Sequence, residues 1–261
     1  MTAVPAVHHR EDVMGTVVTI DVYTTGGQAD GEIAAQLATA RAVLQRADAV
    51  FSTWNPDSPV SRLRRGEITC SQAPDEVRDV LEQCAAAREL SGGWFDPWAM
   101  PGGVDPTGYV KGWAAQRALG AFRAGSISGV LVNAAGDIAS LGGPLTSEPF
   151  KIGIADPFAP RRLAAVVLLT GAIATSGTYE RGDHLIDPHS GRPAARAASA
   201  SVTGPDLGLA DALATAVAVA GPPGLALIEA LDGYEALVIS CDRILRWTER
   251  FPFADRWRET D

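Results

Sequence analysis

The chain has 261 residues, of which 46% are hydrophobic and 20% charged, and its formal net charge is −9. These proportions are close to those of an average globular protein, so we expect one domain over residues 1–261 with a sizeable core and a flexible segment at 1–13. The acidic balance and the lack of any Lys/Arg run exclude a nucleic-acid groove. An anionic ligand would therefore need local positive charge from a metal ion or a few placed cations.

The cysteines and the N-terminal residues bear on the compartment. Cys70, Cys84 and Cys241 are odd in number and far apart, and they fit neither a zinc spacing nor a disulfide framework, which favours a reducing compartment. The first residues hold no apolar signal-peptide core and no lipid-attachment cysteine, and no apolar run approaches a membrane-spanning length. We expect a cytoplasmic protein without a membrane anchor.

Hydrophobic periodicity predicts clustered helices and meandering strands in chain order. Such an order is typical of an α+β fold, with mixed or antiparallel sheets packed with helices, in one chain with two intimate lobes. The predicted elements are a strand at 16–24, a helix at 29–52, a short helix near Val60, a helix at 73–93, an irregular segment at 95–109, a helix at 110–125, strands within 129–143, 150–157 and 162–177, a polar loop at 178–198, a strand at 199–202, a helix from 208 to a breaker at 221–223, a helix at 223–232 and a strand at 235–240.

The apolar run "GLADALATAVAVAG" contains one carboxylate, Asp211, and a hydroxyl four residues later, Thr215. On a helix these two side chains share a face. Asp211 could simply lie in the first helical turn, where the helix dipole favours it, with Thr215 bonding back to a carbonyl. Alternatively the pair is a hard-cation site, because Mg²⁺ takes carboxylate, hydroxyl and carbonyl oxygens. The Ala214 carbonyl could join such a site only where the helix is locally irregular.

Three further loops carry polar residues, and each also has a purely structural interpretation. "VDPTGYVKG" contains Asp105 and Lys111, which fit either a helix-capping loop or a phosphate site. "ATSGTYERGDHLIDPHSGRP" contains a good turn at 187–191 and also His184, the side chain most apt to titrate near neutral pH. "NAAGDI" is either a plain turn or a place where a ligand approaches the backbone.

Taken in order, these stretches resemble the ApbE family, the FAD:protein FMN transferases. The matching segments are "MGTVVTIDVY", "FSTWNPDSPVSRL", "FDP", "VDPTGYVKGWAAQRA", "NAAGDI", "IATSGTYERGDHLIDPHSGRP" and "SVTGPDLGLADALATAVAVAG". The resemblance implies an ApbE-like fold and a Mg²⁺-dependent enzyme. Such an enzyme would transfer FMN from FAD to a Thr or Ser hydroxyl of an acceptor flavoprotein and release AMP.

The resemblance also implies roles for individual residues. The metal would be held by the Asp211 and Thr215 side chains, with carbonyl oxygens from Gly108 and Ala214. His184 would be the general base or a phosphate contact, and Lys111 would join Asp211 and His184 as a catalytic residue. FAD would contact the following residues: Met14, Trp54, Trp94, Phe95, Asp96, Asp105, Lys111 and Ile186.

Two departures from the family pattern are visible. The segment between Asp96 and Asp105, "PWAMPGGV", is much shorter than in the family, and Arg64 stands where Asn often follows "SRL". The shortening predicts a more open flavin pocket and a changed choice of acceptor. Two other functions fit the same residues: a metal-dependent FAD pyrophosphatase, in which water replaces the acceptor hydroxyl, and a flavin-binding protein without turnover.

Overall fold

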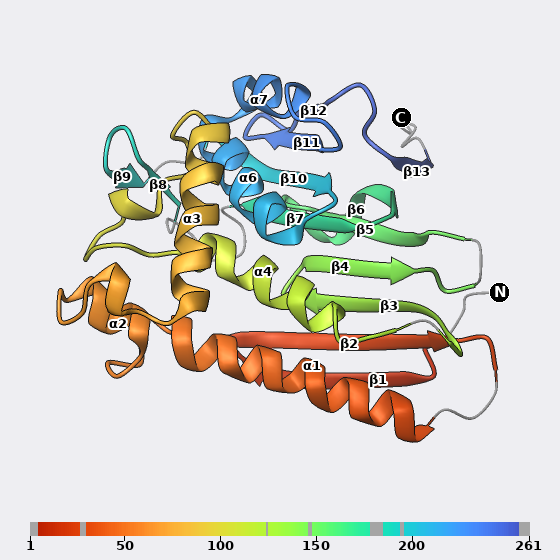
Figure 1. Ribbon diagram of the computed structural model, residues 1–261. Coiled ribbons are helices and arrows are strands. Elements are labelled where there is room, and N and C mark those ends of the chain that lie inside the picture. Colours follow the sequence, from red (N-terminus) through yellow and green to blue (C-terminus); the bar gives the residue numbers. More distant parts are fainter. Residues whose placement is uncertain are drawn as a thin grey trace.

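The computed structural model describes residues 5–26, 30–123, 125–145, 148–177, 185–193 and 196–255. Within them, the centre of the molecule is an eight-stranded sheet whose neighbouring strands are antiparallel (Figure 1). Its spatial order is β1 (Val7–Val13), β2 (Thr16–Thr24), β3 (Ile127–Ala134), β4 (Asp137–Gly142), β7 (Ala172–Gly177), β10 (Ala197–Gly204), β11 (Glu235–Ser240) and β12 (Leu245–Trp247).

Helices cover one face of this sheet and a second, smaller sheet packs on the other (Figure 1). The helices are α1 (Asp30–Phe51), α2 (Pro59–Arg64), α3 (Asp75–Leu90), α4 (Thr107–Leu119), α6 (Leu207–Ala220) and α7 (Leu225–Glu229), with single turns η1 (Cys70–Gln72), η2 (Pro97–Ala99) and η3 (Pro222–Gly224). The smaller sheet has the order β13 (Phe253–Asp255), β6 (Ala159–Leu169) and β5 (Phe150–Asp156), and a separate hairpin pairs β8 (Ile186–Asp187) with β9 (Arg192–Pro193).

Alternation along the central strands distributes side chains between two cores. In β11, Ala236 and Val238 belong to the large cluster under the helices, whereas Leu237 and Ile239 belong to the smaller cluster under β5 and β6. Successive side chains of a strand point to opposite faces, so both faces of this strand are buried. This explains why β11 reads as a continuous apolar run rather than as an alternating one.

Helices α4 and α6 cross at very close range because glycines stand at the contact. A Cβ atom on Gly112 would lie 2.4 Å from the Leu207 carbonyl oxygen and 3.1 Å from Cβ of Asp211. A Cβ atom on Gly208 would lie 2.8 Å from the Tyr109 ring. Only glycine permits this approach, and it brings the N-terminal turns of α4 beside the face of α6 that carries Asp211.

Helix α6 begins earlier than the apolar pattern indicates. Asp206 is its N-cap, and the Asp206 carboxylate accepts a hydrogen bond from the Leu209 backbone N–H at 2.8 Å. Since the helix starts at Leu207, Asp211 lies beyond the first turn, where the dipole has little effect. The interpretation of Asp211 as a residue of the first turn is therefore wrong.

Most elements lie where the sequence predicted them, but the β8–β9 hairpin, β12 and β13 were not predicted, and two other elements differ. Residues Val7–Val13 form β1, which pairs with β2 along its whole length, so this part of the segment expected to be flexible is ordered. Helix α4 runs from Thr107 to Leu119 rather than over 110–125, because it starts after Pro106 and ends before Gly120. The α+β class with antiparallel sheets and packed helices is confirmed, whereas the division into two lobes is not.

No helix within the described ranges is both long and apolar enough to cross a lipid bilayer.

Candidate active site

A cavity of about 440 Å³ opens at one end of the central sheet. Its volume lies within the range of about 300–1,000 Å³ that is usual for small-molecule sites. The lining residues come from elements far apart in the sequence: the turn after β1, the end of α1, the α3–α4 connection, the start of α4, the end of β7, β8 and α6. Segments that the sequence analysis treated separately therefore converge on one site.

Two hairpin tips with strained backbone form part of the wall. Met14 and Ala135 have φ angles of 55° and 53°, and each is followed by a glycine, also at positive φ, in a two-residue hairpin. Type I′ hairpins have positive φ at both central residues and favour Asn, Asp or Gly there. Both Met14 and Ala135 line the cavity. Residues held in this conformation tend to gather at binding sites, so these tips are candidate backbone contacts for a ligand.

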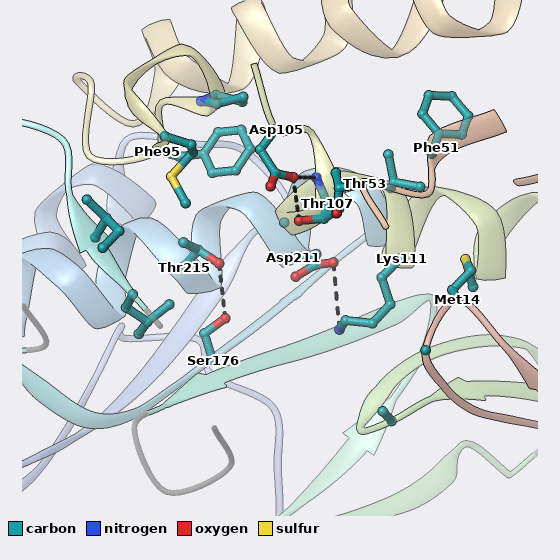
Figure 2. A pocket seen from close by; sticks show the side chains of 18 of the residues that line it. Met14, Phe51, Thr53, Phe95, Asp105, Thr107, Lys111, Ser176, Asp211 and Thr215 are labelled. Carbon is teal, nitrogen blue, oxygen red and sulfur yellow. Dashed lines mark hydrogen bonds and ion pairs between the residues drawn. The ribbon is translucent and has the colours of Figure 1, made fainter. Parts of the chain in front are cut away.

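A lysine lies between two buried carboxylates at the floor of the cavity. The Lys111 ammonium forms an ion pair with Asp137, which is completely buried. It also lies 3.8 Å from Oδ2 of Asp211, as Figure 2 shows. The Thr175 backbone N–H donates a 3.0 Å hydrogen bond to Oδ1 of Asp137. Buried charges are stable only when they are paired and hydrogen-bonded. This arrangement fixes the positive charge of Lys111 beside Asp211.

The Thr215 hydroxyl, which is also on α6, faces β7. The Thr215 and Ser176 hydroxyl oxygens are 3.1 Å apart, and both residues line the cavity (Figure 2). A Cβ atom on Gly108 would lie 3.8 Å from the Thr215 oxygen, so the first turn of α4 reaches this pair. Thr215 thus faces a neighbouring hydroxyl, which is not the back-bonding to a helix carbonyl that the structural alternative assumed.

A backbone hydrogen bond connects α4 to Asp211. The Gly112 N–H donates to Oδ2 of Asp211 at 3.2 Å. In a regular helix this amide donates to the carbonyl oxygen of Gly108. The Gly112 N–H is therefore shared with Asp211, and the Gly108 carbonyl oxygen, which has two lone pairs, can accept a further partner.

The segment around the β8–β9 hairpin lines the cavity with Leu185, Ile186 and Pro188, and polar contacts behind them hold its turn in place. Burial opposes ionisation of Asp187, but hydrogen bonds from the His189 backbone N–H and from the Ser190 and His189 side chains outweigh it and hold the pKa of Asp187 below its ordinary value. The Trp94 ring stacks obliquely on His189 with centroids 4.4 Å apart, and the Arg196 guanidinium lies over the same Trp94 ring, 5.0 Å from its centroid. The turn predicted at 187–191 is therefore confirmed, and it supports Trp94 at the rim.

Cys84 is not a candidate nucleophile for this site. Cys84, on α3, is fully buried, and burial together with the nearby charge of Asp211 raises its pKa to about 12. The thiol is therefore protonated near neutral pH and is a poor nucleophile.

The structure brings most of the residues expected at a site to this one cavity. Trp54 lies at its edge with 93% of its surface exposed, and Phe95 is buried inside. The expected residues that line the cavity are Met14, Trp54, Trp94, Phe95, Asp96, Asp105, Gly108, Lys111, Ile186, Asp211 and Thr215.

Two expected residues are not placed there. His184 lies outside the described residues. Ala214 is in the middle of α6, which continues without interruption to Ala220, so the local irregularity that its carbonyl would need is absent from this helix.

Asp137 and Ser176 belong to the polar stretches "NAAGDI" and "ATSGTYERGDHLIDPHSGRP", but sequence reasoning gave them no role in the site, and it did not consider Thr175. Asp137 begins an apolar strand, and a carboxylate in that position predicts a buried partner. The partner, Lys111, could not be identified, because 26 residues and a complete strand separate the two in the chain.

An antiparallel sheet under packed helices, with a cavity that joins aromatic walls to a buried carboxylate–lysine group, defines a small-molecule-binding protein of the α+β class. The family model of the "ApbE family" matches residues 14–103 and 99–238. The chain therefore belongs to the ApbE family.

A curated relative and several solved structures agree with this assignment. Over 144 residues the chain is 36% identical to an FAD:protein FMN transferase of Rhodobacter capsulatus, and the match covers 52% of this chain but only 27% of that protein. The flavin transferase ApbE of Vibrio cholerae matches with a TM-score of 0.79 at 22% identity, over 93% of this chain and 96% of that one. The ApbE protein of Thermotoga maritima matches with a TM-score of 0.79 at 23% identity, over 93% and 97%. These structural matches show that the fold is shared.

Proposed function

We propose that this protein transfers the FMN part of FAD to a Thr or Ser hydroxyl of an acceptor protein, with Mg²⁺ bound and AMP released. The observation that carries this proposal is the convergence of Asp211, Thr215, Gly108 and Lys111 on one cavity with aromatic walls. Family membership and the name of the Rhodobacter relative support the same activity.

The donor set fits a hard cation. Asp211 offers a carboxylate, Thr215 a hydroxyl and Gly108 a carbonyl oxygen, and all three residues line the cavity. Mg²⁺ prefers such oxygen ligands and is usually held by one or two carboxylates, with water and substrate phosphate completing the shell. The described residues contain no cluster of three or more His, Cys, Asp or Glu side chains that could hold a metal, so we expect a site with few carboxylates. When bound, Mg²⁺ would neutralise charge on the pyrophosphate.

In the proposed reaction the acceptor hydroxyl oxygen attacks the phosphorus of the FMN half of FAD. A new P–O bond forms, the bond from this phosphorus to the bridging oxygen breaks, and AMP leaves with the electron pair. Lys111 supplies a fixed positive charge near the phosphates, because Asp137 holds its ammonium beside Asp211. Catalysis of phosphoryl transfer consists mainly of such positioning and charge stabilisation.

The hydroxyl proton needs an acceptor. We assign this role to His184, which lies between β7 and β8 in the chain. Gly177 and Leu185, the nearest described residues before and after it, both line the cavity. A positioned base contributes about 10²–10⁴-fold to such a step.

The acceptor proteins are proposed to be cytoplasmic. Cys70, Cys84 and Cys241 are all free thiols, which is typical of a reducing compartment.

A transfer assay tests the proposal. The protein is mixed with FAD, MgCl₂ and a candidate acceptor, the mixture is denatured, and flavin fluorescence on the acceptor band and free AMP are measured. We expect a fluorescent acceptor band and an equal amount of AMP, both dependent on Mg²⁺. FMN and AMP without a labelled band would instead identify a pyrophosphatase. FAD binding without either product would identify a flavin-binding protein.

A further inference from the structure

A short segment, residues 97–105, forms one wall of the cavity, and an arginine of α2 fastens it. Asp96, Pro97, Met100 and Asp105 line the cavity at or beside this segment. The segment closes on itself, because the Asp105 N–H donates to the Pro97 carbonyl at 2.9 Å.

Arg64, at the end of α2, contacts the segment at three points. Its guanidinium donates to the carbonyl oxygen of Pro101 at 3.0 Å and to that of Val104 at 3.4 Å. The same group pairs with Oδ2 of Asp105 at 2.8 Å. Only 16% of the Arg64 side chain and 19% of the Asp105 side chain are exposed, so this pair is much better shielded from water than the surface pairs of the same helix.

Two glycines give the segment a backbone conformation in which it can lie against Arg64. Gly102 and Gly103 have φ angles of +81° and +103°, which other residues rarely adopt. A Cβ atom on Gly102 would lie 3.1 Å from Nη2 of Arg64, and one on Gly103 would lie 3.3 Å from its carbonyl oxygen. The two glycines therefore let the loop lie against Arg64 in a conformation that larger residues would disturb.

Asp105 links this contact to the helix that carries Gly108 and Lys111. While Oδ2 of Asp105 faces Arg64, its Oδ1 accepts hydrogen bonds from the Thr107 N–H at 3.0 Å and the Thr107 hydroxyl at 2.7 Å (Figure 2). Thr107 is the first residue of α4. The position of Arg64 is thus transmitted through one carboxylate to the start of α4.

We propose that Arg64 is a positioning residue for flavin binding: by fastening residues 97–105 and Asp105, it sets the wall of the cavity and the start of α4. This inference rests on the proposed function, since it takes FAD as the ligand of the cavity. Arg64 is not among the residues that line the cavity, so it acts through the segment rather than by touching the ligand.

The experiment compares three variants of the full chain by calorimetric titration with FAD in the presence of MgCl₂. Arg64→Ala removes all three contacts. Arg64→Lys keeps a charge for Asp105 but lacks the planar fork that reaches the carbonyl oxygens. Arg62→Ala is the matched control, because Arg62 lies on the same helix and makes only an exposed 3.6 Å pair with Glu67.

We expect Arg64→Ala to raise the Kd for FAD by about tenfold or more, since it leaves a shielded carboxylate unpaired and releases the wall. Arg64→Lys gives an intermediate value and Arg62→Ala the wild-type value. In the transfer assay the KM for FAD rises by a larger factor than kcat falls. Hydrogen exchange without ligand becomes faster in residues 97–107 of Arg64→Ala and stays unchanged in the central strands, which separates local release from general destabilisation.

Two results would overturn the inference in distinguishable ways. If wild type binds FAD and Arg64→Ala binds it within twofold, with unchanged exchange in residues 97–107, the positioning role is wrong and the proposed function stands. If wild type itself does not bind FAD, the proposed function fails and the role of Arg64 in flavin affinity fails with it.

Discussion

Two charged clusters on the helical side of the molecule differ in their surroundings: one lies at the edge of the sheet and the other in the cavity. At the surface, Glu11 of β1 accepts hydrogen bonds from Arg41 at 2.8 Å and Gln45 at 2.7 Å, both on α1. In the cavity, Lys111 of α4 is held between Asp137 and Asp211. The surface cluster joins a strand to a helix at the edge of the sheet, whereas the cavity cluster joins two helices to the centre of the sheet.

The difference shows what burial does to a charged group. In water, an ion pair contributes little, typically about 0–1 kcal/mol. In a shielded site, the same pair is costly to break, and its field acts strongly on a bound ligand. We therefore assign a stabilising role to the Glu11 cluster and a functional role to the Lys111 cluster.

The largest expected effect is on activity and follows from Asp211→Asn. The substitution removes the one carboxylate of the proposed metal site, so we expect FMN transfer to fall by about 10³-fold or more, which corresponds to about 4 kcal/mol. Initial rates of flavin labelling measure it. Asp206→Asn is the control, since Asn is an equally good N-cap for the same helix. Near-normal rates for Asp211→Asn would remove this residue from the metal site.

A smaller effect, on stability, is expected from Asp137→Asn. The change leaves the Lys111 ammonium without its buried partner, and breaking such a pair costs about 3 kcal/mol in the free energy of unfolding. Urea unfolding at pH 7 measures the loss. In the double variant Lys111→Met/Asp137→Asn we expect less destabilisation than in Asp137→Asn alone, because the ammonium that lost its buried partner is removed as well. If the free energy of unfolding of Asp137→Asn lies within about 0.5 kcal/mol of the wild-type value, the ion pair does not stabilise the fold and the prediction is wrong.

The smallest effect is expected from Glu11→Gln and depends on pH. Hydrogen bonds from Gln45, Arg41 and His9 lower the pKa of Glu11 from 4.5 to about 2. A lowered carboxyl pKa stabilises the folded state above the unfolded pKa, and this contribution is lost as the pH falls from 4.5 towards 2. We expect the variant to be about 1 kcal/mol less stable at pH 7 and to converge with wild type as the pH approaches 2. A difference that stays constant over this range would contradict the prediction.

Much of the fold could be predicted from local pattern. The strand at 16–24 and the strand at 235–240 coincide with β2 and β11, because alternating or continuously apolar runs with β-branched residues have few other solutions. Strand β1 was missed because its exposed positions carry charged residues, such as Arg10 and Asp12, that resemble a loop. It pairs with β2 across the two-residue turn Met14–Gly15, whose first residue is Met rather than the Asn, Asp or Gly that signals such a turn.

For the site, too, local features could be predicted from the sequence and contacts between distant residues could not. Asp211 and Thr215 could be selected as a pair, because four residues on one helix fix their relative position. The contacts of Arg64 with Asp105 and of Lys111 with Asp137 could not, because each joins residues on different elements.

By itself, the sequence determined most of the helices and central strands, that the α6 segment carries a carboxylate and a hydroxyl on one face, and which family the chain resembles. Only the tertiary structure decided that these segments surround one cavity, that Lys111 lies between two carboxylates and that Arg64 fastens the wall. The physical reason is range: periodicity and capping act within a few residues, whereas the burial and pairing of charges depend on the whole fold.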